Sequence, residues 1–148
     1  MHSLVRRFIK TAIGFLLAGL ATGGWMLVRR ELYGAYPNAY QVSAHTHAIL
    51  VGFVMMMILG VALWLFPRPD KTDVRYRPAL AEAAYWLVAM GTLARVGGEL
   101  VRPFSAAVAL RWVVVAGGTA QALGIGLFFW TMWTRIRGRP EAEPGAQG

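Results

Sequence analysis

Four long apolar segments limit what this 148-residue chain can fold into. Each is close to the ~20 residues that an α-helix needs to cross the hydrocarbon core of a bilayer. The segments cover residues 8–28, 44–66, 78–100 and 106–133. They predict an all-α fold, an antiparallel four-helix membrane bundle that occupies residues 1–137.

The composition agrees with a membrane protein and excludes several kinds of site. Hydrophobic residues make up 57% of the chain, more than a soluble globular domain usually carries. The absence of cysteine excludes disulfides, thiolate metal sites, iron–sulfur clusters and covalent haem attachment, so any haem is held non-covalently. Residues 138–148 are rich in Gly, Pro and Glu and are predicted to form a disordered cytoplasmic tail.

The formal net charge is +8, but its distribution does not indicate nucleic-acid binding. The basic residues cluster between the apolar segments, where they set membrane topology and contact anionic lipid headgroups. One side collects ten of them: Arg6, Arg7, Lys10, Arg68, Lys71, Arg75, Arg77, Arg135, Arg137 and Arg139. The other side has three: Arg29, Arg30 and Arg102. This bias predicts a multi-pass protein of the cytoplasmic membrane with both termini in the cytoplasm.

The first segment also has a competing interpretation as a cleaved signal peptide, because Arg6 and Arg7 precede it and small residues lie near Ala18. The apolar run reaches Val28, however, and is longer than the ~7–15 residues of a signal sequence. We therefore favour a retained helix.

Two histidines, His45 and His47, lie at the start of the second segment and near the predicted outer surface. Histidine is rare inside membranes and usually functional there, and imidazole is a common ligand of metals and haem iron. On an α-helix these two rings are ~200° apart, so they cannot both bind one iron. The spacing predicts two sites, or one ligand and one supporting group. Below His45, small residues such as Gly52 leave room for a flat macrocycle.

Charged residues are predicted at the same depth as the histidines. Arg95 and Glu99 are one helical turn apart and can form an ion pair, while Arg111 can extend to the lipid headgroups. The alternative is that Arg95 or Arg111 binds haem propionates, because guanidinium matches carboxylates with two parallel hydrogen bonds. Gln121 is predicted to form a hydrogen bond between helices.

The segment from His45 to Phe53, closing with Leu65-Phe66-Pro67-Arg68, resembles a helix of subunit I of the haem-copper oxidases and nitric oxide reductases. It is closer still to small four-helix bacterial proteins identified as oxidase subunit I-like, and residues 11–19 resemble their first helix. In that family an outer-end histidine binds low-spin haem, and a later His-x-His binds two haems on opposite faces. Subunit I has twelve helices in three groups of four. The resemblance therefore implies a homotrimer in which His45 of one copy and His47 of the next hold a b-type haem.

The chain departs from the catalytic members of that family because it has no further set of three histidines for copper or non-haem iron. We therefore expect a haem protein that transfers electrons or binds a diatomic gas, with a redox partner in the respiratory chain, and we leave catalysis undecided. A copper-handling protein that uses Met26 or Met56 beside His45 is one alternative. A non-catalytic assembly or structural subunit of a respiratory complex is the other.

Overall fold

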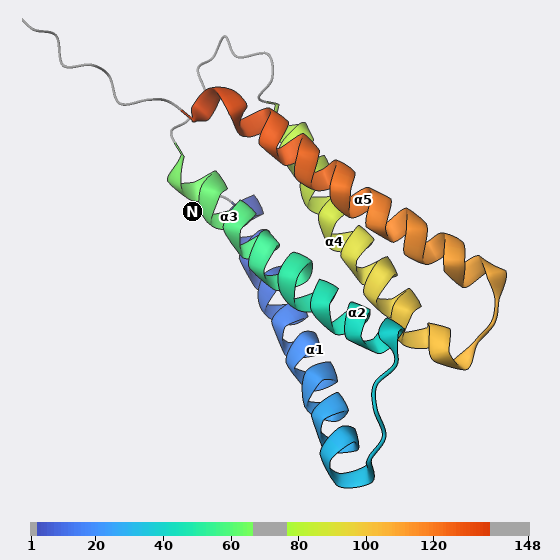
Figure 1. Cartoon of the computed structure of the whole chain (residues 1–148). Coiled ribbons are helices and arrows are strands. Elements are labelled where there is room, and N and C mark those ends of the chain that lie inside the picture. The colour runs from blue at the N-terminus through green and yellow to red at the C-terminus, as the bar shows by residue number, and fades with distance from the viewer. Residues whose placement is uncertain (1–2, 67–76, 137–148) are drawn as a thin grey trace, which may run out of the picture.

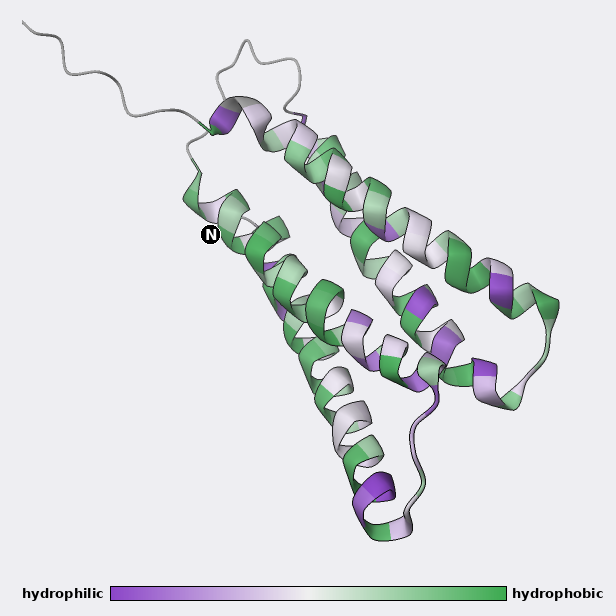
Figure 2. Cartoon of the chain, in the orientation of Figure 1, coloured by the Kyte–Doolittle hydropathy of each residue, from purple (hydrophilic) through white to green (hydrophobic). Residues whose placement is uncertain are grey.

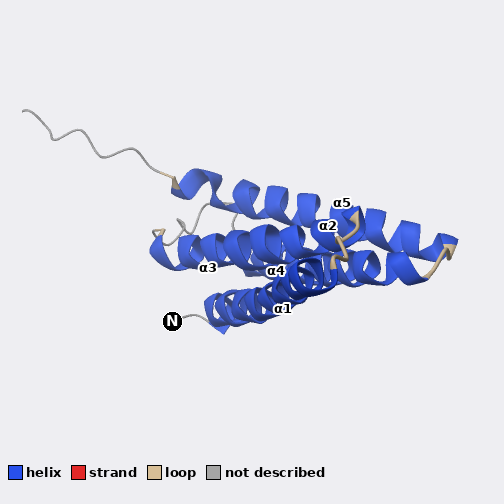
Figure 3. Ribbon diagram, turned by 60° about the horizontal axis from the view of Figure 1, so that its bottom comes forward, coloured by secondary structure: helices blue, strands red, loops and turns tan. Residues whose placement is uncertain are grey.

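The computed structural model describes residues 3–66 and 77–136, and these ranges are helical with short connections (Figures 1 and 3). The first helix, α1, covers Ser3–Tyr33. The second segment is continuous but has three parts: α2 (Ala39–His47), the π-helix η1 (Ala48–Met55) and α3 (Met56–Leu65). The remaining long helices are α4 (Pro78–Val101) and α5 (Val108–Met132), followed respectively by the 3-10 turns η2 (Arg102–Phe104) and η3 (Trp133–Arg135).

The predicted all-α class is confirmed within the described ranges, which contain four helical segments, and the first of them is longer than the predicted 8–28. In the part of the chain that the structure describes, three helices are long and apolar enough to cross a membrane: Ser3–Tyr33, Ala39–Leu65 and Val108–Met132. α4 has 24 residues but is less apolar than the others. Two of its polar side chains are covered by neighbouring helices, since Thr92 and Glu99 are 0% and 3% exposed. The predicted tail at 138–148 lies outside the described residues.

The helices form two antiparallel pairs, α1 with the α2–η1–α3 segment and α4 with α5, and the pairs meet where α2 packs on α4 (Figure 1). Many large apolar side chains are exposed, and this is the surface that lipid or a second copy would cover. Figure 2 shows apolar residues along all the long helices. The buried face of α1 carries Val5, Phe8, Ala12 and Phe15. α1 is thus part of the core.

Large side chains also join the two pairs at the end of the bundle where α1 begins, which we call the core end. The Phe8 ring meets Tyr85 and Phe128 edge-on, with centroids 5.1 and 5.9 Å apart. Arg135 is buried and donates a hydrogen bond of 2.9 Å to the carbonyl oxygen of Phe66, at the end of α3. Aromatic packing and this bond therefore connect α5 to the first helical pair.

Glycines allow α4 and α5 to approach until their backbones touch. A Cβ atom on Gly117 would lie 2.7 Å from the Gly91 carbonyl oxygen and 2.8 Å from the Arg95 nitrogen. In lipid, where apolar helices gain little from hiding apolar surface, close backbone contact is a main source of helix association. One turn further along α5, Gln121 Nε2 donates to Thr92 Oγ1 at 3.0 Å, which confirms the predicted interhelical hydrogen bond.

We predict that Gly117→Ala destabilises the protein by about 1–3 kcal/mol, because the new methyl group meets backbone atoms that cannot move aside. The free energy of unfolding in a detergent–denaturant titration measures this. Gly126→Ala is the matched control in the same helix, since no atom lies within 4 Å of its added Cβ. Equal stability of the two variants would contradict the backbone contact.

Candidate functional site

His45 contacts α1 at the Gly19 carbonyl and packs against Gly23. Its Nδ1 is 2.9 Å from the Gly19 carbonyl oxygen, and a Cβ on Gly23 would come within 2.7 Å of the ring. A carbonyl oxygen only accepts hydrogen bonds, so Nδ1 carries a proton, and Nε2 is the ring nitrogen that is left for a metal. This is the arrangement of histidines that bind metals through one nitrogen while the other donates to a carbonyl.

His47 has the same tautomer but different neighbours. Its Nδ1 donates to the carbonyl oxygen of Ser43 at 2.9 Å, and the Ser43 hydroxyl oxygen lies 3.4 Å from the same nitrogen. That hydroxyl donates to Glu99 Oε1 on α4 at 2.8 Å. His45 is thus attached to α1 and His47 is linked towards α4. The two rings have separate surroundings, as their spacing predicted.

Glu99 and Arg95 complete a polar cluster that we define as Ser43, His47, Arg95 and Glu99. Arg95 Nε donates to Glu99 Oε1 at 3.3 Å, which confirms the predicted ion pair. A terminal guanidinium nitrogen of Arg95 extends over Gly118 of α5, so the cluster spans three helices. Within the described ranges Glu99 Oε2 is buried and has no hydrogen-bond partner. Unsatisfied buried acceptors are uncommon in native structures and often mark functional positions.

A π-helix begins immediately after His47 and continues to Met55. Such helices are rare and occur frequently at functional sites. Gly52 lies within it, and a Cβ there would overlap the ring of Phe15, at 2.5 Å from Cγ. The expectation that Gly52 leaves room for a macrocycle is therefore corrected, because Phe15 of α1 fills that space. The small size of Gly52 allows two helices to pack closely.

Arg111 does not join the polar cluster. Its side chain is exposed at the start of α5 and forms no ion pair or hydrogen bond with the described residues. The structure therefore brings Arg95, but not Arg111, into connection with the histidines. Exposure at a helix end agrees with the alternative interpretation, in which Arg111 extends to headgroups.

Ser43 is the central residue that the sequence analysis missed. It precedes His47 by four residues, which on a helix places the two side chains on one face, so the spacing alone was a usable signal. The contact with Glu99 could not be read from spacing, because it depends on how α2 packs against α4.

Within the described residues, no group of three or more His, Cys, Asp or Glu side chains gathers to hold a metal ion. A metal bound to His45 or His47 therefore needs further ligands, which a porphyrin ring, a methionine thioether or a second copy of the chain could supply. Comparisons with known protein families, with curated proteins and with solved structures find no match to this chain.

We predict that Gly23→Ala displaces the His45 ring and breaks its bond to Gly19, because the new methyl group occupies the position of the ring edge. The chain has three histidines, so selective ¹⁵N-histidine labelling and NMR can follow the Nδ1–H signal of each ring. Gly24→Ala, with no atom within 4 Å of its added Cβ, is the control. An unchanged His45 signal in Gly23→Ala would contradict the close contact between Gly23 and the His45 ring.

Proposed function

We propose that this chain is a multi-pass protein of the cytoplasmic membrane, with both termini in the cytoplasm, that binds b-type haem through His45 and His47. The observation that supports it most directly is the shared tautomer of the two rings. Each uses Nδ1–H on a backbone carbonyl, which leaves Nε2 as the atom able to bind iron. Bound haem would supply one-electron chemistry, which suits electron transfer with a respiratory-chain partner or binding of a diatomic gas.

The separation of the two rings supports a site between copies of the chain. His45 points into α1 and His47 is linked towards α4, so a haem held by both kinds of histidine needs one from each of two protomers. Closed rings of identical subunits repeat such an interface around an axis. A trimer would assemble twelve helices, the number that the resemblance to oxidase subunit I implies.

Arg95 is the residue of this chain best suited to bind haem propionates. Its Nε is engaged by Glu99, while a terminal nitrogen extends over Gly118, where no side chain intervenes. A guanidinium can bind a carboxylate through these remaining N–H groups. Arg111 is reserved for the lipid headgroups in this proposal.

A second candidate function, a non-catalytic structural subunit, is favoured by the contact between His45 and the Gly19 carbonyl. In that case the ring only joins α1 to α2 through a hydrogen bond. The copper-handling alternative has less support: Met56 is fully buried in the core and Met26 lines a separate crevice near Asn38.

Visible spectra of the detergent-purified protein, oxidised and dithionite-reduced, test the haem proposal. We expect a sharp reduced α-band that His45→Ala and His47→Ala each abolish. Thr46→Ala is the matched control, because its hydroxyl bonds only the Val42 carbonyl of its own helix, and it should keep the band. A colourless wild-type protein expressed with ample haem would refute the proposal and favour the structural subunit.

Co-expression of the two histidine variants tests whether the site is shared between subunits. A mixed ring contains interfaces where an intact His45 faces an intact His47. With random mixing about a quarter of the wild-type haem per subunit should return, although neither variant binds haem alone. No recovery, in oligomers shown to contain both variants, would place the ligands within one copy.

A further inference from the structure

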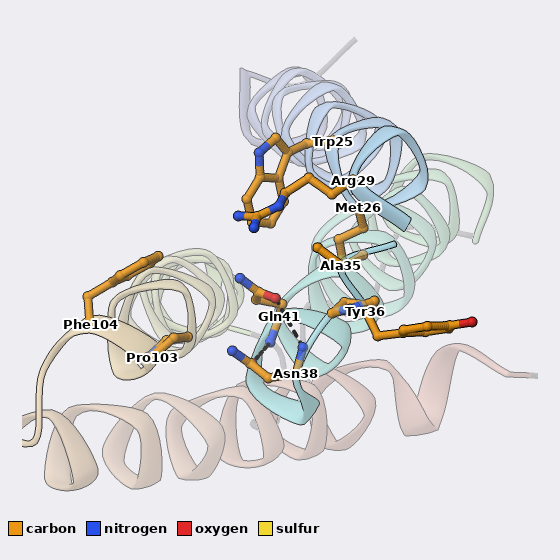
Figure 4. Close-up of a pocket in the computed structure, with 10 residues that line it drawn as sticks. Trp25, Met26, Arg29, Ala35, Tyr36, Asn38, Gln41, Pro103 and Phe104 are labelled. Carbon is orange, nitrogen blue, oxygen red and sulfur yellow. Dashed lines mark hydrogen bonds between the residues drawn. The ribbon is translucent and has the colours of Figure 1, made fainter. Parts of the chain in front are cut away.

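A crevice opens at the histidine end, between the last turns of α1, the start of α2 and η2 (Figure 4). It consists of two hollows of about 200 and 400 Å³ that share Trp25, Gln41 and Phe104 as walls. Arg29 and Asn38 line the smaller hollow, and Leu100 lines the larger one. We call this space the α1–η2 crevice. It is separate from the polar cluster and plays no part in the function proposed above.

The start of α2 gives the crevice free hydrogen-bond donors. Asn38 and Gln41 form a capping box, in which Asn38 Oδ1 accepts from the Gln41 backbone at 3.0 Å and Gln41 Oε1 accepts from the Asn38 backbone at 3.1 Å. Both side-chain oxygens are thereby used, and both amide nitrogens remain without a partner in the described part of the chain. Gln41 is only 8% exposed, and its amide nitrogen points into the space between Trp25 and Phe104 (Figure 4).

Arg29 adds a positive charge that the described residues do not neutralise. Its guanidinium lies 5.2 Å from the centroid of the Trp25 ring and at the side of the crevice (Figure 4). The carboxylates of the described ranges are all engaged by other arginines: Glu31 by Arg30, Glu82 by Arg7 and Glu99 by Arg95. The smaller hollow therefore offers N–H donors and a cation, and the side chains around it supply no carboxylate.

The larger hollow is apolar by comparison. Its walls are Ala21 and Thr22 of α1, Leu100 of α4 and the aromatic rings of Trp25 and Phe104, with Gln41 at the junction of the two hollows. It continues from the donor-rich hollow along the membrane-spanning part of α1. A ligand that fills both hollows has an anionic, acceptor-rich head and an apolar chain.

We propose that the α1–η2 crevice is a binding site for one acidic phospholipid. The phosphate oxygens accept hydrogen bonds from Arg29 and Gln41, a geometry that guanidinium groups favour. One acyl chain lies in the larger hollow, against Leu100 and Trp25. The site selects acidic over zwitterionic lipids because no carboxylate of the described residues pairs with Arg29.

Lipid titration followed by native mass spectrometry tests this, using the detergent-purified full chain with phosphatidylglycerol and, separately, phosphatidylcholine. Gln41→Glu keeps the oxygen that caps Asn38 and replaces the donor nitrogen with an acceptor, so we expect about tenfold weaker binding of phosphatidylglycerol. Arg29→Gln should give a similar loss and, as an exposed residue, should leave the fold unchanged. Arg30→Gln removes the same charge from the adjacent position, paired with Glu31, and should bind normally.

Four results would overturn the proposal. Unchanged binding by Gln41→Glu and Arg29→Gln would exclude the crevice, and an equal loss in Arg30→Gln would indicate attraction by overall charge. Equal affinity for phosphatidylcholine would remove the role of Arg29. Displacement of the lipid by millimolar inorganic phosphate would identify a site for free anions. None of these results depends on whether the chain binds haem.

Discussion

The rest of the structure depends on close backbone contact between helices at glycine. In a membrane protein, hydrophobic burial does not draw helices together, so association relies on dispersion contacts and on hydrogen bonds between polar groups. Gly91 and Gly117 bring α4 against α5, Gly19 brings α1 against Ile49, and Gly23 brings α1 against the His45 ring. Because the helices are close, polar side chains of α4 can form hydrogen bonds with their neighbours. Thr92 bonds to α5, Glu99 to α2, and Arg95 pairs with Glu99 along α4 itself.

The same contacts explain why polar residues are tolerated on a helix that lies among apolar ones. An imidazole or carboxylate in such surroundings costs free energy unless it is hydrogen-bonded. His45 uses the Gly19 carbonyl, His47 uses Ser43, and Glu99 uses Ser43 and Arg95. Each bond also fixes the orientation of the side chain. The residues of the candidate site are therefore preorganised by the fold itself.

The approximate positions of the four helices were predictable because an apolar run long enough to cross a membrane can be recognised directly in the sequence. The opposite orientation of His45 and His47 followed from helical geometry, and the Arg95–Glu99 pair from its spacing. The prediction that Gly52 leaves room for a macrocycle was wrong. In sequence, a glycine that makes space for a ligand cannot be told from one that makes space for Phe15. The link between Ser43 and Glu99, and the π-helix after His47, depend on tertiary packing and had no local signal.

The aromatic core and the bond between Arg135 and the Phe66 carbonyl have a mechanical consequence. They hold the two helical pairs together at one end of the bundle. At the other end the pairs are connected through α2 and α4 by small side chains and a few polar bonds. The buried apolar residues at this end are smaller than those of the aromatic core. His45 and His47 both lie on α2, so a shift of α2 against α4 would move both rings while the aromatic core stays in place.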